Sequence, residues 1–308
     1  MSLPKPILVT GSHRSGSTWV GRMIAEAPSV CYIHEPFNVS DPPSRGVCNA
    51  EFKYWFTYIT SENESNFYRA FRNTLELKFD LIGALQSVKS LHNFRSLFPN
   101  YLDFLRHRIR GSRVLLKDPL AFFSSEWLAE KFDMAIIVVI RHPAAFVSSV
   151  KKLNWSHPFS HFLGQPLLLN NFLAPFEAEI KEYAAKEHEI IDQAILLWNL
   201  IHYTVTQFQH HHPDWTFIRH EDLSRNPIHG FQSLFSRLQL EFTENVRDVI
   251  VQHTASFNPS DSEEAYSLKR NSNLNRWNWK NRLSQSEIEK IRSKVEFVSK
   301  AFYSDEDW

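Results

Sequence analysis

The chain has 308 residues, of which 43% are hydrophobic and 22% charged, and its formal net charge at pH 7 is zero. This composition is typical of a folded globular protein, and the lack of a basic excess argues against a nucleic-acid partner. The longest apolar run, residues 134–140, is far too short to span a membrane. Two cysteines, Cys31 and Cys48, make no disulfide framework. With no signal peptide before the first predicted strand, we expect a cytoplasmic protein.

The first predicted elements are a strand, a glycine-bracketed loop and a helix. Residues 7–9 form an apolar run typical of a buried parallel strand. Gly11 and Gly16 bracket a loop of small and polar residues, and apolar residues then recur at helical spacing until Pro28. Loop amides and the unpaired N–H groups of the first helical turn point at one spot, where the helix dipole favours negative charge. The stretch therefore predicts an anion-binding cradle.

The spacing of Gly11 and Gly16 matches the first part of a P-loop, but Ser17 occupies the position of the P-loop lysine. Arg14 is the only lysine or arginine inside the loop. A nucleoside triphosphatase needs that lysine on its β- and γ-phosphates, so the loop indicates a different phosphate ligand. A P-loop nucleoside or nucleotide kinase stays as an alternative, although no clear Walker-B acid follows an apolar strand.

Four more strands are predicted along the chain. Residues 30–33 lead into His34 and Glu35, at the sheet edge where open α/β sheets bind ligands. Residues 113–119 form the next buried strand, residues 134–140 form the most apolar and therefore central strand, and residues 215–219 form the last. Helical periodicity covers residues 18–27, 67–85, 126–129, 143–150, 177–212, 228–238, 243–253 and 285–302, and the acidic tail 304–308 is expected to fray.

This alternation predicts an α/β fold: a three-layer sandwich with a central, mainly parallel sheet, like that of P-loop NTPases, with helical insertions. We expect one domain over residues 1–308, because no linker, repeat or low-complexity tract divides the chain. Residues 40–111 lack strand–helix alternation and are interpreted as a helical cap. Residues 154–176 are rich in Pro, His and Phe, which favours a lid or a substrate loop.

A second anion site is predicted after the strand at residues 134–140. Arg141 ends that strand, and Ser149 lies eight positions later on the helix that Pro143 opens. Because His142 and Ser149 are two helical turns apart, the serine should lie on the face beside the arginine. A fork-shaped guanidinium and a hydroxyl suit a phosphate dianion. The alternative is an arginine that caps the strand end and a serine that faces solvent.

Together these motifs resemble those of sulfotransferases that use 3′-phosphoadenosine 5′-phosphosulfate (PAPS). Residues 12–19 resemble the 5′-phosphosulfate loop, residues 139–149 the 3′-phosphate motif, and residues 276–284 the C-terminal Trp-Lys segment that closes over PAPS. The last match lacks the usual Gly-x-x-Gly, so it leaves open which cation, Lys280 or Arg276, contacts the 3′-phosphate, and whether the tryptophans pack in the core instead. The resemblance implies that PAPS is bound by Ser12, His13, Arg14, Ser15, Gly16, Ser17, Thr18, Trp19, Arg141, Ser149, Trp279 and Lys280.

Glu35 is the candidate general base, because it follows a strand at the ligand edge, where burial is expected to raise its pKa. The motif Lys117-Asp118-Pro119 has proline where cytosolic sulfotransferases carry a histidine base. It instead resembles carbohydrate and tyrosylprotein sulfotransferases, in which a glutamate equivalent to Glu35 is the base. That resemblance implies that Lys117 and Arg14 stabilise the bridging oxygen. His34 is a competing base and Asp118 a weaker one.

The resemblance implies a PAPS-dependent sulfotransferase that moves the sulfuryl group to a hydroxyl of a carbohydrate or other small-molecule alcohol. Adenosine 3′,5′-bisphosphate (PAP) would leave, and no metal is expected because the donor carries its own good leaving group. Residues 40–111 and 154–176 would form the acceptor side. The alternatives are the kinase named above and a catalytically inactive nucleotide-binding homologue. The identity of the acceptor and the oligomeric state are left open.

Overall fold

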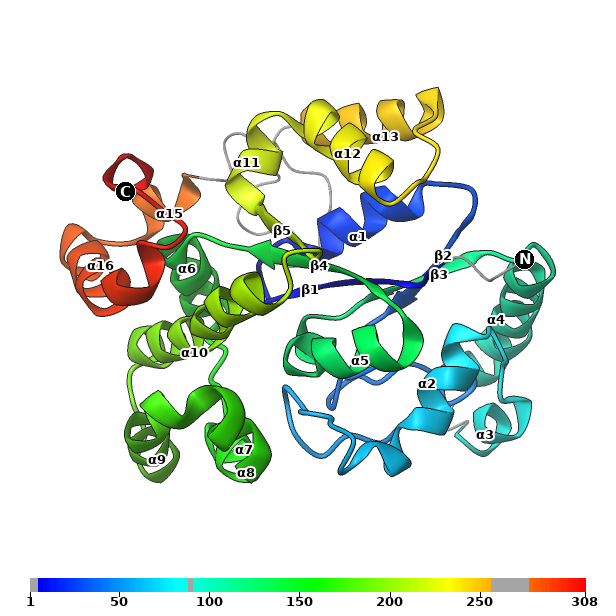
Figure 1. The fold of residues 1–308 in the computed structure, drawn as a ribbon, viewed down its shortest axis with the longest axis horizontal. Coiled ribbons are helices and arrows are strands. Elements are labelled where there is room, and N and C mark those ends of the chain that lie inside the picture. Colours follow the sequence, from blue (N-terminus) through cyan, green and yellow to red (C-terminus); the bar gives the residue numbers. More distant parts are fainter. Residues whose placement is uncertain (1–4, 88–90, 256–276) are drawn as a thin grey trace.

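The structure is a computed structural model that describes residues 5–87, 91–255 and 277–308 (Figure 1). Within these residues five strands form one parallel sheet in the order β2-β3-β1-β4-β5. The predicted strands are all present, but β1, and not the more apolar β4, lies in the middle. The strands are β1 Ile7–Gly11, β2 Val30–His34, β3 Arg113–Lys117, β4 Ala135–Ile140 and β5 Thr216–Arg219.

The register of the sheet brings the carboxyl ends of the strands to one edge. Gly11 pairs with Val139, and His34 pairs with Lys117. Because every pairing is parallel, the residues that follow the strands meet at this edge.

Helices cover both faces of the sheet, which confirms the three-layer α/β prediction (Figure 1). Ile7 and Val9 of β1 pack on the α1, α12 and α13 side, whereas Leu8 packs on the side of α5, α6 and α10. This is the alternation expected of a buried strand. The helices are α1 Ser17–Ala25, α2 Tyr68–Leu75, α3 Leu81–Gln86, α4 Leu91–Ile109, α5 Ser125–Phe132, α6 Pro143–Leu153, α7 Ser160–Leu163, α8 Pro166–Leu168, α9 Glu177–Ala185, α10 Ile190–His211, α11 His220–Arg225, α12 Pro227–Arg237, α13 Glu244–Ala255, α15 Asn278–Arg282 and α16 Gln285–Ser299.

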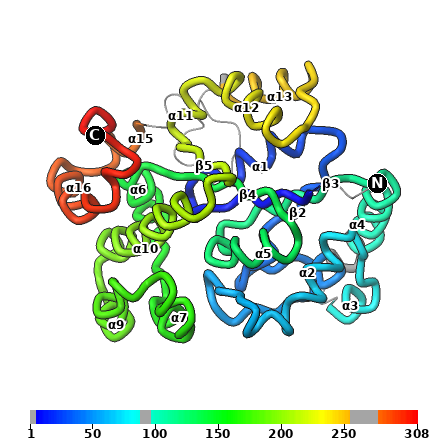
Figure 2. The backbone as a smooth tube through the Cα atoms, viewed as in Figure 1, coloured from blue at the N-terminus to red at the C-terminus, as the bar shows by residue number. Residues whose placement is uncertain are grey.

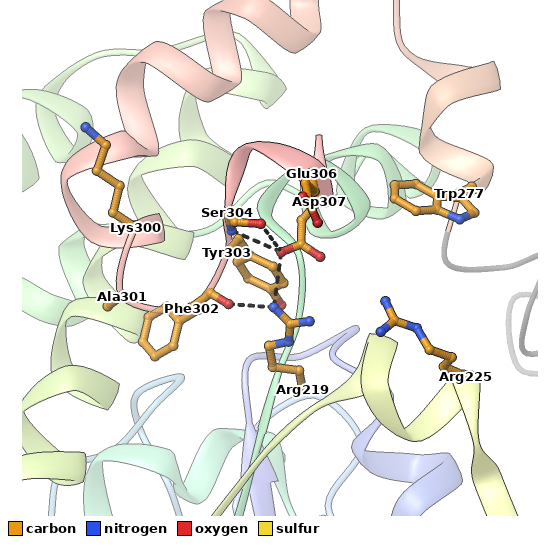
Figure 3. Close-up of a pocket in the computed structure, with 10 residues that line it drawn as sticks. All are labelled: Arg219, Arg225, Trp277, Lys300, Ala301, Phe302, Tyr303, Ser304, Glu306 and Asp307. Atoms are coloured by element: carbon orange, nitrogen blue, oxygen red, sulfur yellow. Dashed lines mark hydrogen bonds and ion pairs between the residues drawn. The ribbon is translucent and has the colours of Figure 1, made fainter.

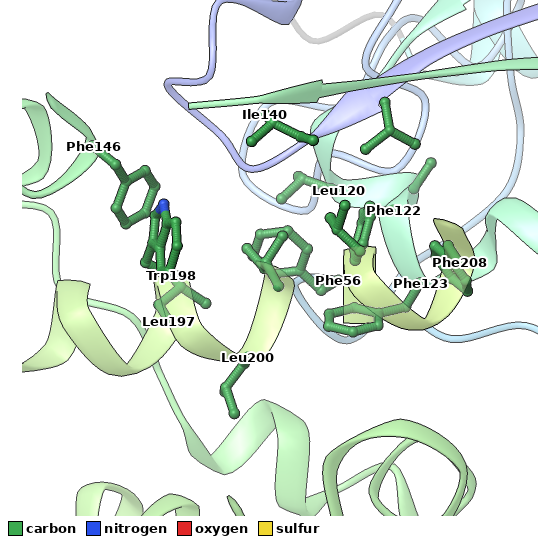
Figure 4. Close-up of a cluster of buried hydrophobic side chains, with 14 of the residues drawn as sticks. Phe56, Leu120, Phe122, Phe123, Ile140, Phe146, Leu197, Trp198, Leu200 and Phe208 are labelled. Atoms are coloured by element: carbon green, nitrogen blue, oxygen red, sulfur yellow. The ribbon is translucent and has the colours of Figure 1, made fainter. Parts of the chain in front are cut away.

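The larger core lies between α10 and the sheet (Figure 4). Trp198 and Phe208 of α10 are fully buried there, as are Phe122 and Phe123 of the short 3₁₀ helix Pro119–Ser124. Burial of each such ring contributes roughly 1.5–3 kcal/mol, so this layer fixes α10 beneath the sheet.

The two segments without a strand pattern are helical and irregular. Residues 40–111 contain α2, α3 and α4, which lie beyond the β2 and β3 end of the sheet (Figure 2). Residues 154–176 contain the short helices α7 and α8, which lie with α9 beside α10 (Figure 1). Across the described residues, none of the helices has the length and apolar character needed to cross a bilayer.

Two boundary predictions are wrong. The single helix expected over residues 177–212 is two helices, α9 and α10. Residues 186–189 between them are not helical. The acidic tail does not fray. Its 3₁₀ turn Asp305–Asp307 is capped by Ser304, Asp307 accepts a 3.2 Å hydrogen bond from Arg219, and Trp308 packs 4.6 Å from the ring of His142.

Candidate active site

The glycine loop requires glycine at both of its ends. Gly11 has φ 133°, and a Cβ added there would lie 2.3 Å from the carbonyl oxygen of Val139 on the neighbouring strand. Gly16 has φ 94°, and a Cβ there would lie 2.3 Å from Cδ2 of His220. The glycines therefore permit close approach to β4 and α11 as well as the left-handed backbone.

Two serines of this loop carry polar atoms without partners. Ser12 and Ser15 are fully buried, and neither Oγ atom makes a hydrogen bond within the described residues. The loop closes on itself through the amide of Ser15, which donates to the carbonyl of Ser12 at 3.1 Å. A buried hydroxyl without a partner costs roughly 1–3 kcal/mol, so an anion received by this loop would relieve that cost. Ser17 is buried at the first position of α1, and Thr18 and Trp19 behind it are half-buried.

Arg14 connects the loop to the second predicted anion site. Its backbone is left-handed, with φ 62°. Its Nε donates to Oγ of Ser149 on α6 at 2.9 Å, and its guanidinium lies 5.6 Å from the ring centre of Trp155. The loop and the face of α6 that carries Ser149 are therefore in direct contact.

His13 points toward aromatic side chains of α6 and of the two inserted segments. Its ring lies 6.1 Å from that of Phe56, 5.1 Å from that of Phe146 and 6.3 Å from that of Trp155. Burial, assisted by the charge of Arg14, lowers the pKa of His13 to about 4. His13 is therefore neutral at physiological pH.

Arg141 lies one histidine ring away from the glycine loop. Its Nη1 is 2.6 Å from Nδ1 of His220, and the ring of His220 is the group that a side chain at Gly16 would strike. Its Nε is 3.5 Å from Oε1 of Glu221. Glu221 also accepts hydrogen bonds from the His142 amide at 3.1 Å and from the Tyr303 hydroxyl at 3.0 Å. Glu221 thus holds the end of β4 and the guanidinium of Arg141 in place.

Glu35 and Lys117 form an ion pair at the carboxyl ends of β2 and β3. Lys117 is 1% exposed and bonds Oε1 of Glu35, whose side chain is 18% exposed. Asn38 donates from Nδ2 to Oε2 at 2.9 Å, and Nε2 of His34 lies 3.9 Å from the same oxygen. The Glu35 amide donates to the Lys117 carbonyl at 2.9 Å, which fixes the turn at φ 43°.

The expected direction of the Glu35 pKa is wrong. Burial acts to raise this pKa, but the charge and hydrogen bond of Lys117, with smaller contributions from His34 and Asn38, bring it below its ordinary value. Burial also lowers the pKa of Lys117, and the charge of Glu35 opposes that decrease. Glu35 is thus a carboxylate paired with a buried cation.

Asp118, the weaker candidate base, is a fully buried structural anchor. Its Oδ1 accepts from the Leu120 amide at 2.9 Å and its Oδ2 from the Phe37 amide at 2.6 Å. Burial raises the pKa of Asp118 to about 7, although the hydrogen bonds from both backbone amides oppose that increase. Asp118 therefore joins the turn after β2 to the 3₁₀ helix after β3.

The C-terminal Trp-Lys segment packs beside Arg141. Trp279 is buried and stacks on His142 at 5.0 Å between ring centres, which matches the core-packing alternative. Lys280 donates from Nζ to the main-chain oxygen of Trp308 at 2.6 Å and lies 4.3 Å from the ring centre of Trp277. The other candidate cation, at position 276, lies outside the described residues.

A polar pocket opens between α11, α15 and the C-terminal turn (Figure 3). At its base Arg219 donates to the Phe302 carbonyl at 2.7 Å and to Asp307. Arg225 and Trp277 face each other across the opening, and Arg225 makes no ion pair or hydrogen bond within the part of the chain that the structure describes. A smaller cavity beside it is lined by His142 and Trp279.

Sequence reasoning missed Asn38, Trp155 and His220 as members of the site. The spacing of Asn38, three residues after Glu35 in a turn, was a local signal that could have identified it. His220 stands in residues 219–223, whose resemblance to a carbohydrate sulfotransferase pattern was a signal for packing near the site. Trp155 gave no comparable signal, because its partner Arg14 lies far away in the sequence. Among the described residues, no group of three or more His, Cys, Asp or Glu side chains is arranged to hold a metal ion.

An open parallel sheet with a glycine loop and several cations at its carboxyl edge is the arrangement in which α/β proteins commonly bind phosphate-bearing ligands. The chain belongs to the sulfotransferase family, since the model described as "Sulfotransferase family" matches residues 6–244. The predicted family is therefore confirmed, and sulfuryl transfer is the activity that membership supports. No curated protein sequence matches the chain.

The chain is also similar to solved sulfotransferase structures. A sulfotransferase domain from the curacin biosynthetic pathway is 14% identical, with 96% of this chain and 99% of that chain covered and a TM-score of 0.47. A sulfotransferase domain from the Synechococcus PCC 7002 olefin synthase is 13% identical, with 99% and 97% covered and a TM-score of 0.49. A mouse sulfotransferase complexed with PAP is 13% identical, with 98% and 86% covered and a TM-score of 0.48.

Proposed function

We propose that the protein transfers the sulfuryl group of PAPS to a hydroxyl of a carbohydrate or other small-molecule alcohol and releases PAP. The observation that carries this proposal is the 2.9 Å hydrogen bond from Arg14 to Ser149, which joins the glycine loop to the helix that follows Arg141. PAPS has anionic groups at both its 5′ and 3′ ends, and two neighbouring anion sites at one sheet edge suit such a nucleotide.

In this proposal the glycine loop receives the 5′-phosphosulfate. The buried hydroxyls of Ser12 and Ser15 and the first-turn amides of α1 would donate to it. Arg141 and Ser149 would hold the 3′-phosphate, because a guanidinium fork and a hydroxyl match a phosphate dianion. Lys280 is proposed as a further cation for that phosphate. The phosphate would then compete with the main-chain oxygen of Trp308 for the Lys280 ammonium.

Glu35 is the proposed general base. It takes the proton of the acceptor hydroxyl while the acceptor oxygen attacks sulfur in line with the bond to the leaving phosphate oxygen. That sulfur–oxygen bond breaks, its electron pair stays on the phosphate of PAP, and Lys117 and Arg14 stabilise the growing charge. As the ammonium of Lys117 turns toward the bridging oxygen, its hold on Glu35 weakens, and the basicity of Glu35 rises when a base is needed.

Residues 1–308 are proposed to act as one domain, with residues 40–111 and 154–176 on the acceptor side. The packing of His13 against Phe56 and Trp155, one from each segment, supports that arrangement. The cytoplasmic location stays a prediction, and the free thiols of Cys31 and Cys48 are compatible with it.

The test begins with donor binding. PAPS and PAP should raise the melting temperature in a thermal-shift assay, and Mg²⁺-ATP should not, since Ser17 stands where a kinase needs lysine. Radiolabelled PAPS with a pool of sugars, phenols and lipid alcohols then reports transfer. Donor binding with no transfer to any acceptor would favour a catalytically inactive homologue.

Glu35→Gln tests the base. We expect turnover to fall about 10²- to 10⁴-fold while PAP affinity stays close to that of the wild type. Glu62→Gln, which changes an exposed glutamate in the same way, is the matched control. Normal turnover in Glu35→Gln would exclude Glu35 as the base.

A further inference from the structure

Three side chains face the carboxylate of Glu35, and they differ in what they can do with a proton. Lys117 is 1% exposed and is held in its ion pair with Glu35. Asn38 donates through an amide, which does not titrate. His34 is the third, and its side chain is 54% exposed. Of these three groups, only His34 can both accept a proton in its neutral form and reach solvent.

Resting on the proposed function, we propose that His34 conducts to solvent the proton that Glu35 takes from the acceptor. Transfer of sulfate leaves Glu35 as a neutral acid beside a buried cation, and the next turnover needs the carboxylate again. His34 is thus a positioning and relay residue that acts through Glu35 after the sulfur–oxygen bond has formed.

The geometry suits such a transfer. Nε2 of His34 lies 3.9 Å from Oε2 of Glu35, so one bridging water or a small side-chain rotation completes the path. Nδ1 of His34 lies 3.2 Å from the hydroxyl of Tyr32. Because a phenolic hydroxyl both donates and accepts, Tyr32 supports either tautomer of the ring.

The step is balanced as two proton transfers. First the bond between Oε2 of Glu35 and its proton breaks as a bond from Nε2 of His34 to that proton forms, which gives a carboxylate and an imidazolium. The imidazolium then gives one proton to water or buffer and becomes neutral again. No electrons change hands, and the ion pair between Glu35 and Lys117 is restored.

The charges around His34 favour a neutral ring before the transfer. Burial and then the charge of Lys117 lower the pKa of His34, while Glu35 opposes that decrease. A neutral imidazole is the form that can accept a proton, and imidazole is ordinarily about two pKa units more basic than a carboxylate. The titratable and charged groups that face His34 come from its own strand and turn, from α1, from β3 and from the loop after β2: Tyr32, Glu35, Arg22, Lys117 and Asp41.

The experiment separates the first turnover from those that follow. Rapid-quench assays use radiolabelled PAPS with 4-nitrophenol, or with the first alcohol that accepts sulfate in the pooled assay. For His34→Gln we expect a first turnover at the wild-type rate, then a steady state at least about tenfold slower that accelerates with added imidazole. His229→Gln changes an exposed histidine on α12 in the same way and should match the wild type.

Each outcome decides the proposal. A His34→Gln first turnover as slow as its steady state would make His34 a group of the chemical step and would overturn the relay. A steady state equal to that of the wild type, or one that does not respond to imidazole, would overturn it as well. Unchanged PAP affinity in His34→Gln excludes a folding defect. The first turnover of Glu35→Gln is measured independently. A wild-type rate in that variant would reject Glu35 as the general base, whatever the result for His34→Gln.

Discussion

The contact between Gly16 and His220 gives a prediction that can be worked through in numbers. Gly16→Ala places a methyl group 2.3 Å from Cδ2 of His220. His220 cannot swing away freely, because its ring is buried, lies 5.5 Å from that of Trp19 and contacts Arg141. A left-handed alanine costs about 1–2 kcal/mol, and forcing a methyl into a packed site adds about 1–3 kcal/mol. We expect Gly16→Ala to lower the free energy of unfolding by about 2–5 kcal/mol.

Gly111→Ala is the matched control, because Gly111 also has a positive φ, 64°, but nothing lies within 4 Å of an added Cβ. In urea unfolding, the free energy of unfolding of Gly111→Ala should fall only by the backbone cost of about 1–2 kcal/mol. In Gly16→Ala, displacement of His220 and Arg141 should also remove the proposed contact of Arg141 with the 3′-phosphate, which would be worth about 1.5–3 kcal/mol, or about 10- to 150-fold in affinity for PAP. Calorimetric titration with PAP measures this directly. If Gly16→Ala bound PAP as tightly as Gly111→Ala does, the assignment of Arg141 to the nucleotide would be refuted.

Three further predictions address the proposed base, the core and the C-terminal segment. Asn38→Ala removes the 2.9 Å hydrogen bond that the Asn38 side-chain amide donates to Glu35. We expect kcat to fall about tenfold, the equivalent of about 1.4 kcal/mol, while PAP affinity measured by calorimetry stays unchanged. Burial, then the charge of Arg141, holds the pKa of His142 at about 3, so between pH 6.5 and 3 the unfolded ring gains a proton that the folded ring does not. The free energy of unfolding therefore decreases by about 1.4 kcal/mol per pH unit as pH falls through that window. In urea unfolding, His142→Phe should show a smaller decrease than the wild type over the same range. Lys280→Met should weaken binding of PAP more than that of adenosine 5′-monophosphate, and an equal loss would limit Lys280 to its bond with Trp308.

The strands and the glycine loop were predictable because each depends on a short stretch of sequence. The six residues of β4 are all apolar, and Gly11 and Gly16 stand at a recognisable spacing. The position of β4 was not predictable in this way, since hydrophobicity indicates burial on both faces but not which strand lies in the middle. The ordered tail likewise depends on tertiary contacts, such as that of Asp307 with Arg219.

The site itself depends on pairs that are distant along the chain. Arg14 and Ser149 are 135 positions apart, and Lys117 and Glu35 are 82 apart. In a parallel sheet each strand presents the residues that follow it at the same edge, so sequence reveals which residues are offered, whereas strand order decides which of them meet. Lys117 meets Glu35 because β3 lies beside β2 with Lys117 paired to His34. Burial of Glu35 alone implied a raised pKa, and the adjacency of two strands reversed that direction.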